Sequence, residues 1–97
     1  MSLGADSENW RAISGYPNYQ VSDLGRVRNT TTWRILKPGI RAGYYFVFLS
    51  KDRVRKQYSV HRLVAAEFLE NPDGRTLEDH IDHCKTNNFV SNLRYAT

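Results

Sequence analysis

The chain has 97 residues, a formal net charge of +4 and 40% hydrophobic residues, which suit one small domain with a modest core. It has no apolar run long enough to cross a membrane and no charged-then-apolar leader, which argues against membrane and secreted proteins. Its single cysteine, Cys84, excludes an internal disulfide and a Cys-x-x-Cys zinc pair. We therefore expect an intracellular protein, in the cytoplasm of a host cell, whose residues 1–8 are a leader outside the fold.

The charge is unevenly distributed along the chain. Residues 1–60 carry ten Lys and Arg against four Asp and Glu, whereas residues 61–97 carry four against six. A basic front and an acidic back suit a protein that binds a polyanion and holds a cation beside it. A soluble domain with one cationic face is the plainer alternative.

The front of the chain, residues 9–59, is predicted to form short β-strands separated by turns. The segment over residues 43–49 is the strongest of these, because it is rich in aromatic and branched residues. Turn-forming residues follow most of the segments. The expected strands are residues 19–22, 26–28, 33–36, 43–49 and 55–59.

One helix is expected next, because apolar residues recur at helical spacing. Ser59 is a candidate N-cap, and the helix should end at Asn71, because the residue before a proline avoids helical geometry. The chain then turns toward residues 77–80, which should begin a β-hairpin. The predicted fold class is α+β. The apolar stripe of the helix consists of Val60, Leu63, Val64 and Phe68.

The last nineteen residues contain side chains suited to phosphodiester hydrolysis. Asp79 could hold a hard divalent cation, and the neighbouring His80 could take a proton from water. Strand neighbours point to opposite faces, so both can serve one phosphate only where the strand ends or bends. Asn92 could then fasten the following loop through its amide.

Two other interpretations of this segment stay open on the residues alone. The Asp-His pair could be an ordinary polar pair in a turn. Alternatively His80, His83 and Cys84 could bind zinc in a binding domain, although their spacing offers three crowded ligands and no distant pair to complete a tetrahedron.

Several ordered motifs resemble known families. Residues 78–82 (Glu-Asp-His-Ile-Asp), 87–88 (Asn-Asn) and 92–95 (Asn-Leu-Arg-Tyr) resemble the HNH homing-endonuclease signature, whose usual form is close to Asp-His-Ile-Asp-Gly, Asn-Asn, Asn-Leu-Arg-Trp. The upstream motifs resemble the NUMOD4 module that accompanies such nucleases in phage and intron-encoded enzymes. These upstream motifs lie within residues 10–16, 19–27 and 60–65.

The resemblance implies a ββα-metal (HNH, His-Me finger) nuclease fold and a metal-dependent DNA endonuclease of the nicking or homing type. It implies a catalytic site in which Asp79 is the first ligand of one Mg²⁺ or Mn²⁺ ion, with no zinc. His80 is then the general base, and Asn92 is the middle Asn that holds the loop. The family continues into a helix with a second metal ligand, which by family spacing would lie beyond Thr97, so we expect a nuclease motif without its final helix.

His83 departs from the family pattern, which usually has glycine at this position. Glycine would allow a positive φ, so His83 implies an altered turn or an additional polar group near the phosphate.

Double-stranded DNA is the expected partner, bound by basic residues of the front half and by Arg62 at the start of the helix. For His61 we favour a hydrogen bond inside the fold over a DNA contact. The main alternative to the nuclease is a non-catalytic DNA-binding module with an incomplete site. The predicted DNA-binding residues are Arg26, Arg28, Arg34, Lys37, Arg41, Arg53, Arg55, Lys56 and Arg62.

Overall fold

Three small antiparallel sheets surround one α-helix in the computed structural model, which describes residues 8–71, 74 and 77–96. The sheets have the strand orders β1-β2-β3, β4-β5-β6 and β7-β8. The fold class is therefore α+β, as the sequence predicts. The elements are β1 (Trp10–Ile13), β2 (Tyr16–Ser22), β3 (Val27–Asn29), β4 (Gly39–Arg41), β5 (Tyr44–Lys51), β6 (Val54–Ser59), α1 (Val60–Phe68), β7 (Leu77–His80), the 3-10 helix η2 (Val90–Asn92) and β8 (Leu93–Ala96).

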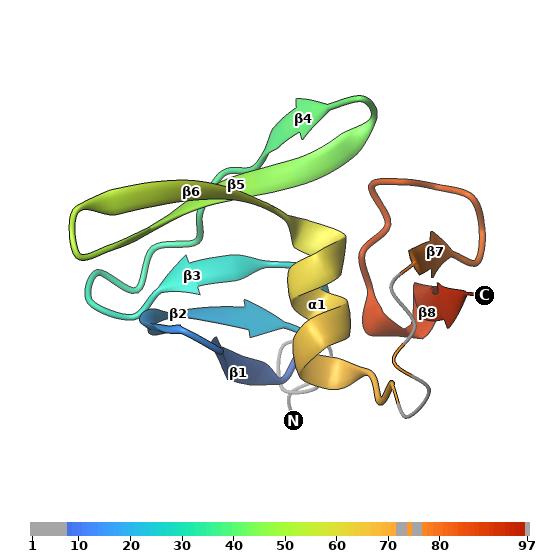
Figure 1. The fold of residues 1–97 in the computed structure, drawn as a ribbon, viewed down its shortest axis with the longest axis horizontal. Coiled ribbons are helices and arrows are strands. Elements are labelled where there is room, and N and C mark those ends of the chain that lie inside the picture. The colour runs from blue at the N-terminus through green and yellow to red at the C-terminus, as the bar shows by residue number, and fades with distance from the viewer. Residues whose placement is uncertain (1–7, 72–73, 75–76, 97) are drawn as a thin grey trace, which may run out of the picture.

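Helix α1 stands between the two three-stranded sheets and the β7–β8 hairpin (Figure 1). Its buried face packs against β1, β2, β5 and β6, and also against β7, β8 and η2. One apolar core therefore joins the front of the chain to its last hairpin. The buried core residues are Ile13, Tyr19, Val21, Val27, Val47, Leu49, Val60, Leu63, Val64 and Leu93.

The structure corrects the expected strand over residues 33–36. A tight turn over residues 30–32 precedes this segment, because the backbone oxygen of Asn29 accepts from Trp33 N and its side-chain oxygen accepts from Thr31 N and Thr32 N. Trp33 has a left-handed φ of 59°. Only a single bridge, between Arg28 and Ile35, follows the turn.

The ends of α1 also differ from the prediction. Ser59 stands at the N-cap position, but its side chain makes no capping hydrogen bond. The helix ends at Phe68, before Asn71, because Leu69 already has extended backbone angles. Within the described part of the chain, no helix has the length and apolar character needed to span a membrane.

Residues 1–7 of the expected leader lie outside the described residues. Glu8, which was grouped with them, forms an ion pair with Arg26.

Candidate active site

His80 is the last residue of β7 and is buried, with 5% of its surface exposed. Its Nε2 lies 2.8 Å from Oδ1 of the buried Asn88. Its ring packs against the rings of His61 and Tyr44, at centroid distances of 5.2 and 5.9 Å. The imidazole is therefore fixed by contacts from α1, β5 and the loop after β7.

The bond to Asn88 sets the tautomer of His80. An amide oxygen can only accept a hydrogen bond, so His80 Nε2 carries the hydrogen in this arrangement. The lone pair of the neutral imidazole is then on Nδ1. The sequence did not predict that Asn88 would bond to His80, although Asn88 belongs to the Asn-Asn pair of the motif.

Asp79 lies beside His80 and on the opposite face of the strand. It pairs across the hairpin with Arg94 of β8, whose Nε and Nη2 lie 3.1 and 3.0 Å from Asp79 Oδ2. Its carboxylate is partly exposed to solvent, since the exposed fraction of its side chain is 37%. Strand β7 ends at His80, which is the condition under which both side chains could serve one phosphate.

Asn92 fastens the loop that follows β7. Its Oδ1 accepts from Asp82 N at 3.1 Å, and its Nδ2 donates to Asp82 Oδ1 at 2.9 Å and to Asn87 O at 2.8 Å. Hydrogen bonds from Asn87, from the Cys84 backbone and from Asn92 hold the pKa of the Asp82 carboxyl below its usual value. Asn92 thus makes the backbone contacts that its place in the sequence predicts.

His83 keeps the left-handed conformation that a glycine would adopt there, with a φ of 64°. The turn therefore accommodates the histidine without leaving the positive-φ region, contrary to one of the two expectations for this residue.

The zinc interpretation gains no support from the arrangement of these side chains. Among the described residues, no three His, Cys, Asp or Glu side chains gather closely enough to hold a metal ion. Cys84 is exposed, whereas His80 is directed into the fold toward Asn88.

His61 lies inside the fold, as expected, but it is held mainly by ring packing. It stacks on Tyr44 and His80, and its buried Nδ1 is without a hydrogen-bond partner among the described residues. Burial lowers the pKa of His61 to about 4, with smaller contributions from the charges of His80 and Arg62. His61 is therefore neutral at physiological pH and places no positive charge against His80.

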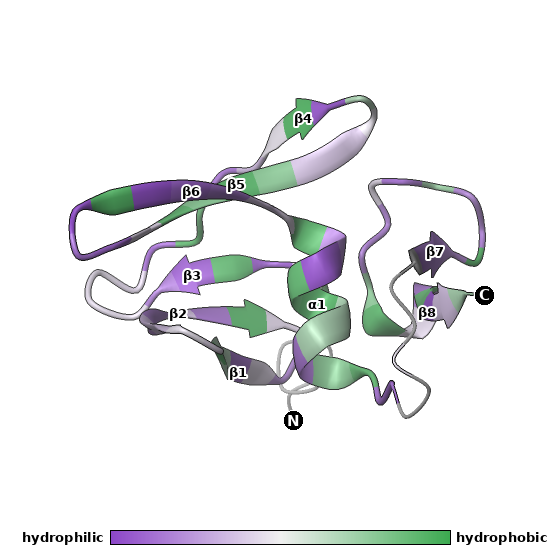
Figure 2. Ribbon diagram, viewed as in Figure 1, coloured by the Kyte–Doolittle hydropathy of each residue, from purple (hydrophilic) through white to green (hydrophobic). Residues whose placement is uncertain are grey.

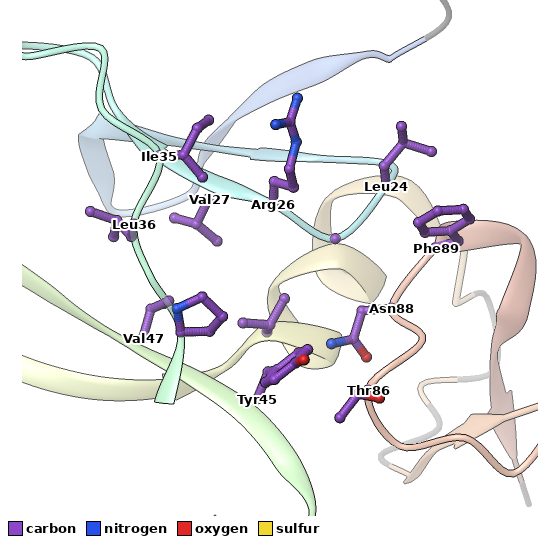
Figure 3. Close-up of a pocket in the computed structure, with 13 residues that line it drawn as sticks. Leu24, Arg26, Val27, Ile35, Leu36, Tyr45, Val47, Thr86, Asn88 and Phe89 are labelled. Atoms are coloured by element: carbon purple, nitrogen blue, oxygen red, sulfur yellow. The ribbon is translucent and has the colours of Figure 1, made fainter. Parts of the chain in front are cut away.

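Asn88 also borders a cavity of about 270 Å³ between β3, β5 and the loop before η2 (Figure 3). Most of its walls are apolar, including Val27, Tyr45 and Phe89. Gly25 has a φ of +83°, and a Cβ placed on it would lie 2.8 Å from Asn88 Cβ. A turn in the front half of the chain thus needs glycine so that Asn88 can approach.

The predicted DNA-binding residues divide into paired and open side chains. Arg26 is paired with Glu8, and Arg62 Nε lies 3.4 Å from Glu78 Oε1. Arg26 and Arg28 both lie over the ring of Trp10, so they share one face of the sheet, as alternation predicts. Arg55 and Lys56 are exposed on β6, which is mostly hydrophilic (Figure 2). Arg34, Lys37, Arg41 and Arg53 are also exposed.

Known proteins resemble both halves of this arrangement. The NUMOD4 motif matches residues 8–50 and ends before residues 60–65, which the sequence analysis grouped with it. DNA endonuclease I-HmuI of Bacillus phage SP01 is 40% identical over 90 residues, which are 91% of this chain and 52% of that protein. An uncharacterized HNH endonuclease, L245, of Acanthamoeba polyphaga mimivirus is 41% identical over 90% of this chain and 26% of its own length.

The similarity extends to three dimensions. The solved structure of the HNH homing endonuclease I-HmuI, described as one of DNA binding and cleavage, matches the fold of this chain. The TM-score is 0.84 and the sequence identity is 39%. The match covers 92% of this chain and 52% of that one. The chain thus spans from about a quarter to about half of the relatives it resembles. In sequence and in fold, the chain is therefore similar to part of the HNH endonucleases, and its residues 8–50 match the NUMOD4 motif.

Proposed function

We propose that the protein is a metal-dependent DNA endonuclease of the nicking or homing type, with His80 as general base and Asp79 as a ligand of one divalent cation. The observation that carries the proposal is the buried, hydrogen-bonded imidazole of His80 beside a solvent-accessible carboxylate at the end of β7. This pair lies in a chain that is similar in fold to an HNH homing endonuclease.

His80 is suited to accept a proton from a water molecule. Its Nδ1 has the free lone pair, while Asn88 Oδ1 accepts the hydrogen on Nε2 at 2.8 Å. When Nδ1 takes up a proton, that same oxygen stabilises the imidazolium. The neutral His61 ring keeps the imidazole of His80 oriented without opposing its charge.

Asp79 fits a hard cation, although Arg94 shares one of its oxygens. Mg²⁺ is commonly bound by one or two carboxylates, with water and substrate phosphate as the other ligands. One accessible carboxylate, a phosphate of the DNA and waters therefore match what Mg²⁺ or Mn²⁺ requires. When bound, such an ion would neutralise charge on the phosphate and on the departing oxygen. Asn92 would act indirectly, because it fixes the loop that follows His80.

Double-stranded DNA is the proposed substrate. The exposed cations of β4, of the loop before it and of the β5–β6 hairpin would contact phosphates, and such contacts fix the position of a protein on the duplex. The residues in these elements are Arg34, Lys37, Arg41, Arg53, Arg55 and Lys56. The proposed DNA contacts also include Arg26, just before β3, Arg28 of β3 and Arg62 of α1.

The test is conversion of supercoiled plasmid to open circles in Mg²⁺ or Mn²⁺. The parent should nick, and nicked circles should precede linear DNA because each chain has one active centre. His80→Ala and the closer replacement His80→Asn should not nick, although both should still bind DNA in a gel-shift assay. Glu70→Gln is the control, since Glu70 is exposed and has no proposed role in the site, and it should still nick. Equal nicking by the parent and both His80 variants would refute the assignment.

A non-catalytic DNA-binding module is the second candidate. It is favoured by the ion pair between Arg94 and Asp79, because this pair engages the carboxylate that would hold the cation. Under this candidate the parent binds plasmid but does not nick it, and charge reversal at Arg55 and Lys56 weakens binding.

A further inference from the structure

Arg28 is half-buried and is held by one side-chain hydrogen bond and two aromatic rings. Its strand neighbour Val27 is buried, so Arg28 points to the opposite, outer face of the β1-β2-β3 sheet. Across the sheet, Gln20 Oε1 accepts from Arg28 Nε at 2.8 Å. The guanidinium lies over two indole rings, 4.0 Å from the centroid of Trp10 and 4.8 Å from that of Trp33. Its plane is therefore fixed before any ligand arrives.

Trp33, one of these two rings, is unusual in both exposure and backbone. Its side chain is part of the surface, with 61% of the residue exposed, and its φ of 59° is rare for a bulky residue. The turn that holds this conformation is built by Asn29. An exposed aromatic ring kept in an unfavourable conformation indicates a surface role, because core packing does not require it.

The guanidinium of Arg28 combines an anchored edge with an open one. Arg26 and Arg62 are engaged by carboxylates. Arg28 is anchored through Nε, and no hydrogen bond or ion pair of its two Nη groups is found within the described residues. A planar guanidinium with one edge anchored and the other open is suited to two parallel acceptors.

We propose that Arg28 is a specificity-determining residue that reads a guanine in the major groove through its O6 and N7 atoms, with Trp10 and Trp33 holding its plane. This inference rests on the proposed function. A phosphate also offers paired acceptors, but a mobile cation suffices to contact it, whereas reading a base edge needs a fixed donor plane. The longest dimension of the protein is 41 Å, or about 12 base pairs at roughly 3.4 Å each, so the guanine should lie within that distance of the cut.

The experiment is selection of duplexes from a randomised pool, carried out without divalent metal and followed by sequencing. The parent should enrich a site with guanine at a fixed position. Arg28→Lys should reduce the preference for guanine there by about 5- to 150-fold, because a bidentate contact supplies that range of discrimination. Trp33→Ala, at an exposed position, should weaken the same preference without unfolding the protein. Arg11→Lys is the matched control, since Arg11 is exposed on β1 and lies outside the predicted DNA-binding set, and it should select the parent's site.

Three results would overturn the inference. The parent could enrich no sequence, Arg28→Lys could retain the guanine preference, or Arg28→Lys could weaken all sequences equally, as expected for a phosphate contact. Plasmid nicking by the parent but not by His80→Ala is measured separately. The endonuclease proposal can therefore stand if the assignment of Arg28 fails, and failure of nicking leaves the result of the selection interpretable.

Discussion

Acidification should destabilise the protein through His61, which is buried between Tyr44 and His80. In the folded state the pKa of His61 is about 4, whereas its ordinary value is 6.5. Between these values the unfolded chain binds a proton that the folded chain does not, so the free energy of unfolding falls as the pH falls. The difference of about 2.5 units corresponds to about 3 kcal/mol, present in full above pH 6.5 and lost by about pH 4.

The assay is urea unfolding followed by circular dichroism at about pH 7 and about pH 4.5. Other groups titrate in this range, so the effect is isolated by comparing the parent with His61→Phe, which keeps a ring against Tyr44 and His80. His61→Phe should lose about 2–3 kcal/mol less than the parent over the interval. The exposed His83→Ala variant should lose as much as the parent. An equal loss in the parent and in His61→Phe would refute the reasoning.

Three further predictions concern Asn92, Gly25 and the ion pair between Arg94 and Asp79. Asn92→Ala removes two donated bonds and one accepted bond, so it should lower the free energy of unfolding by about 2–3 kcal/mol in urea titrations. Gly25→Ala should cost about 2–4 kcal/mol and slow plasmid nicking, because the new Cβ would strain a positive φ and displace Asn88. Arg94→Gln frees Asp79 Oδ2, so nicking should reach half its maximal rate at an Mg²⁺ concentration about two- to fivefold lower. An unchanged Mg²⁺ requirement would argue against Asp79 as the ligand.

The sequence predicted most of the elements, but not β1 or β4, because hydrophobic periodicity and turn residues are local signals that are weak in short strands. The strand over residues 43–49, the helix and the hairpin all occur, with different ends. The prediction of a strand over residues 33–36 was wrong, because the alternation of side chains in this segment resembles that of a strand. The turn that precedes this segment depends on the side chain of Asn29, whose oxygen accepts hydrogen bonds from the backbone two and three positions ahead. Such local capture of the backbone has no periodic signature.

The sequence predicted which residues are candidates for the site, but not which residues hold them in place. Asp79, His80 and Asn92 could be named from their motif, since each residue type suits its role. The partners of His80 could not, because Tyr44 and His61 approach it from distant parts of the chain. Those contacts arise from tertiary packing, which the spacing of apolar residues along the chain does not reveal.

The contacts that hold His80 in place indicate that the front half of the chain does more than bind DNA. Tyr44 and Gly25 lie within the residues that match the NUMOD4 motif, whereas His80 and Asn88 lie beyond them. Tyr44 packs against the imidazole, and Gly25 allows the approach of the amide that bonds it. Protein side chains in direct contact transmit displacement to one another. A shift of either three-stranded sheet on binding DNA would therefore reach His80 through Asn88 or Tyr44. We propose that these sheets contact the duplex, and they also form two sides of the site that we propose cleaves it.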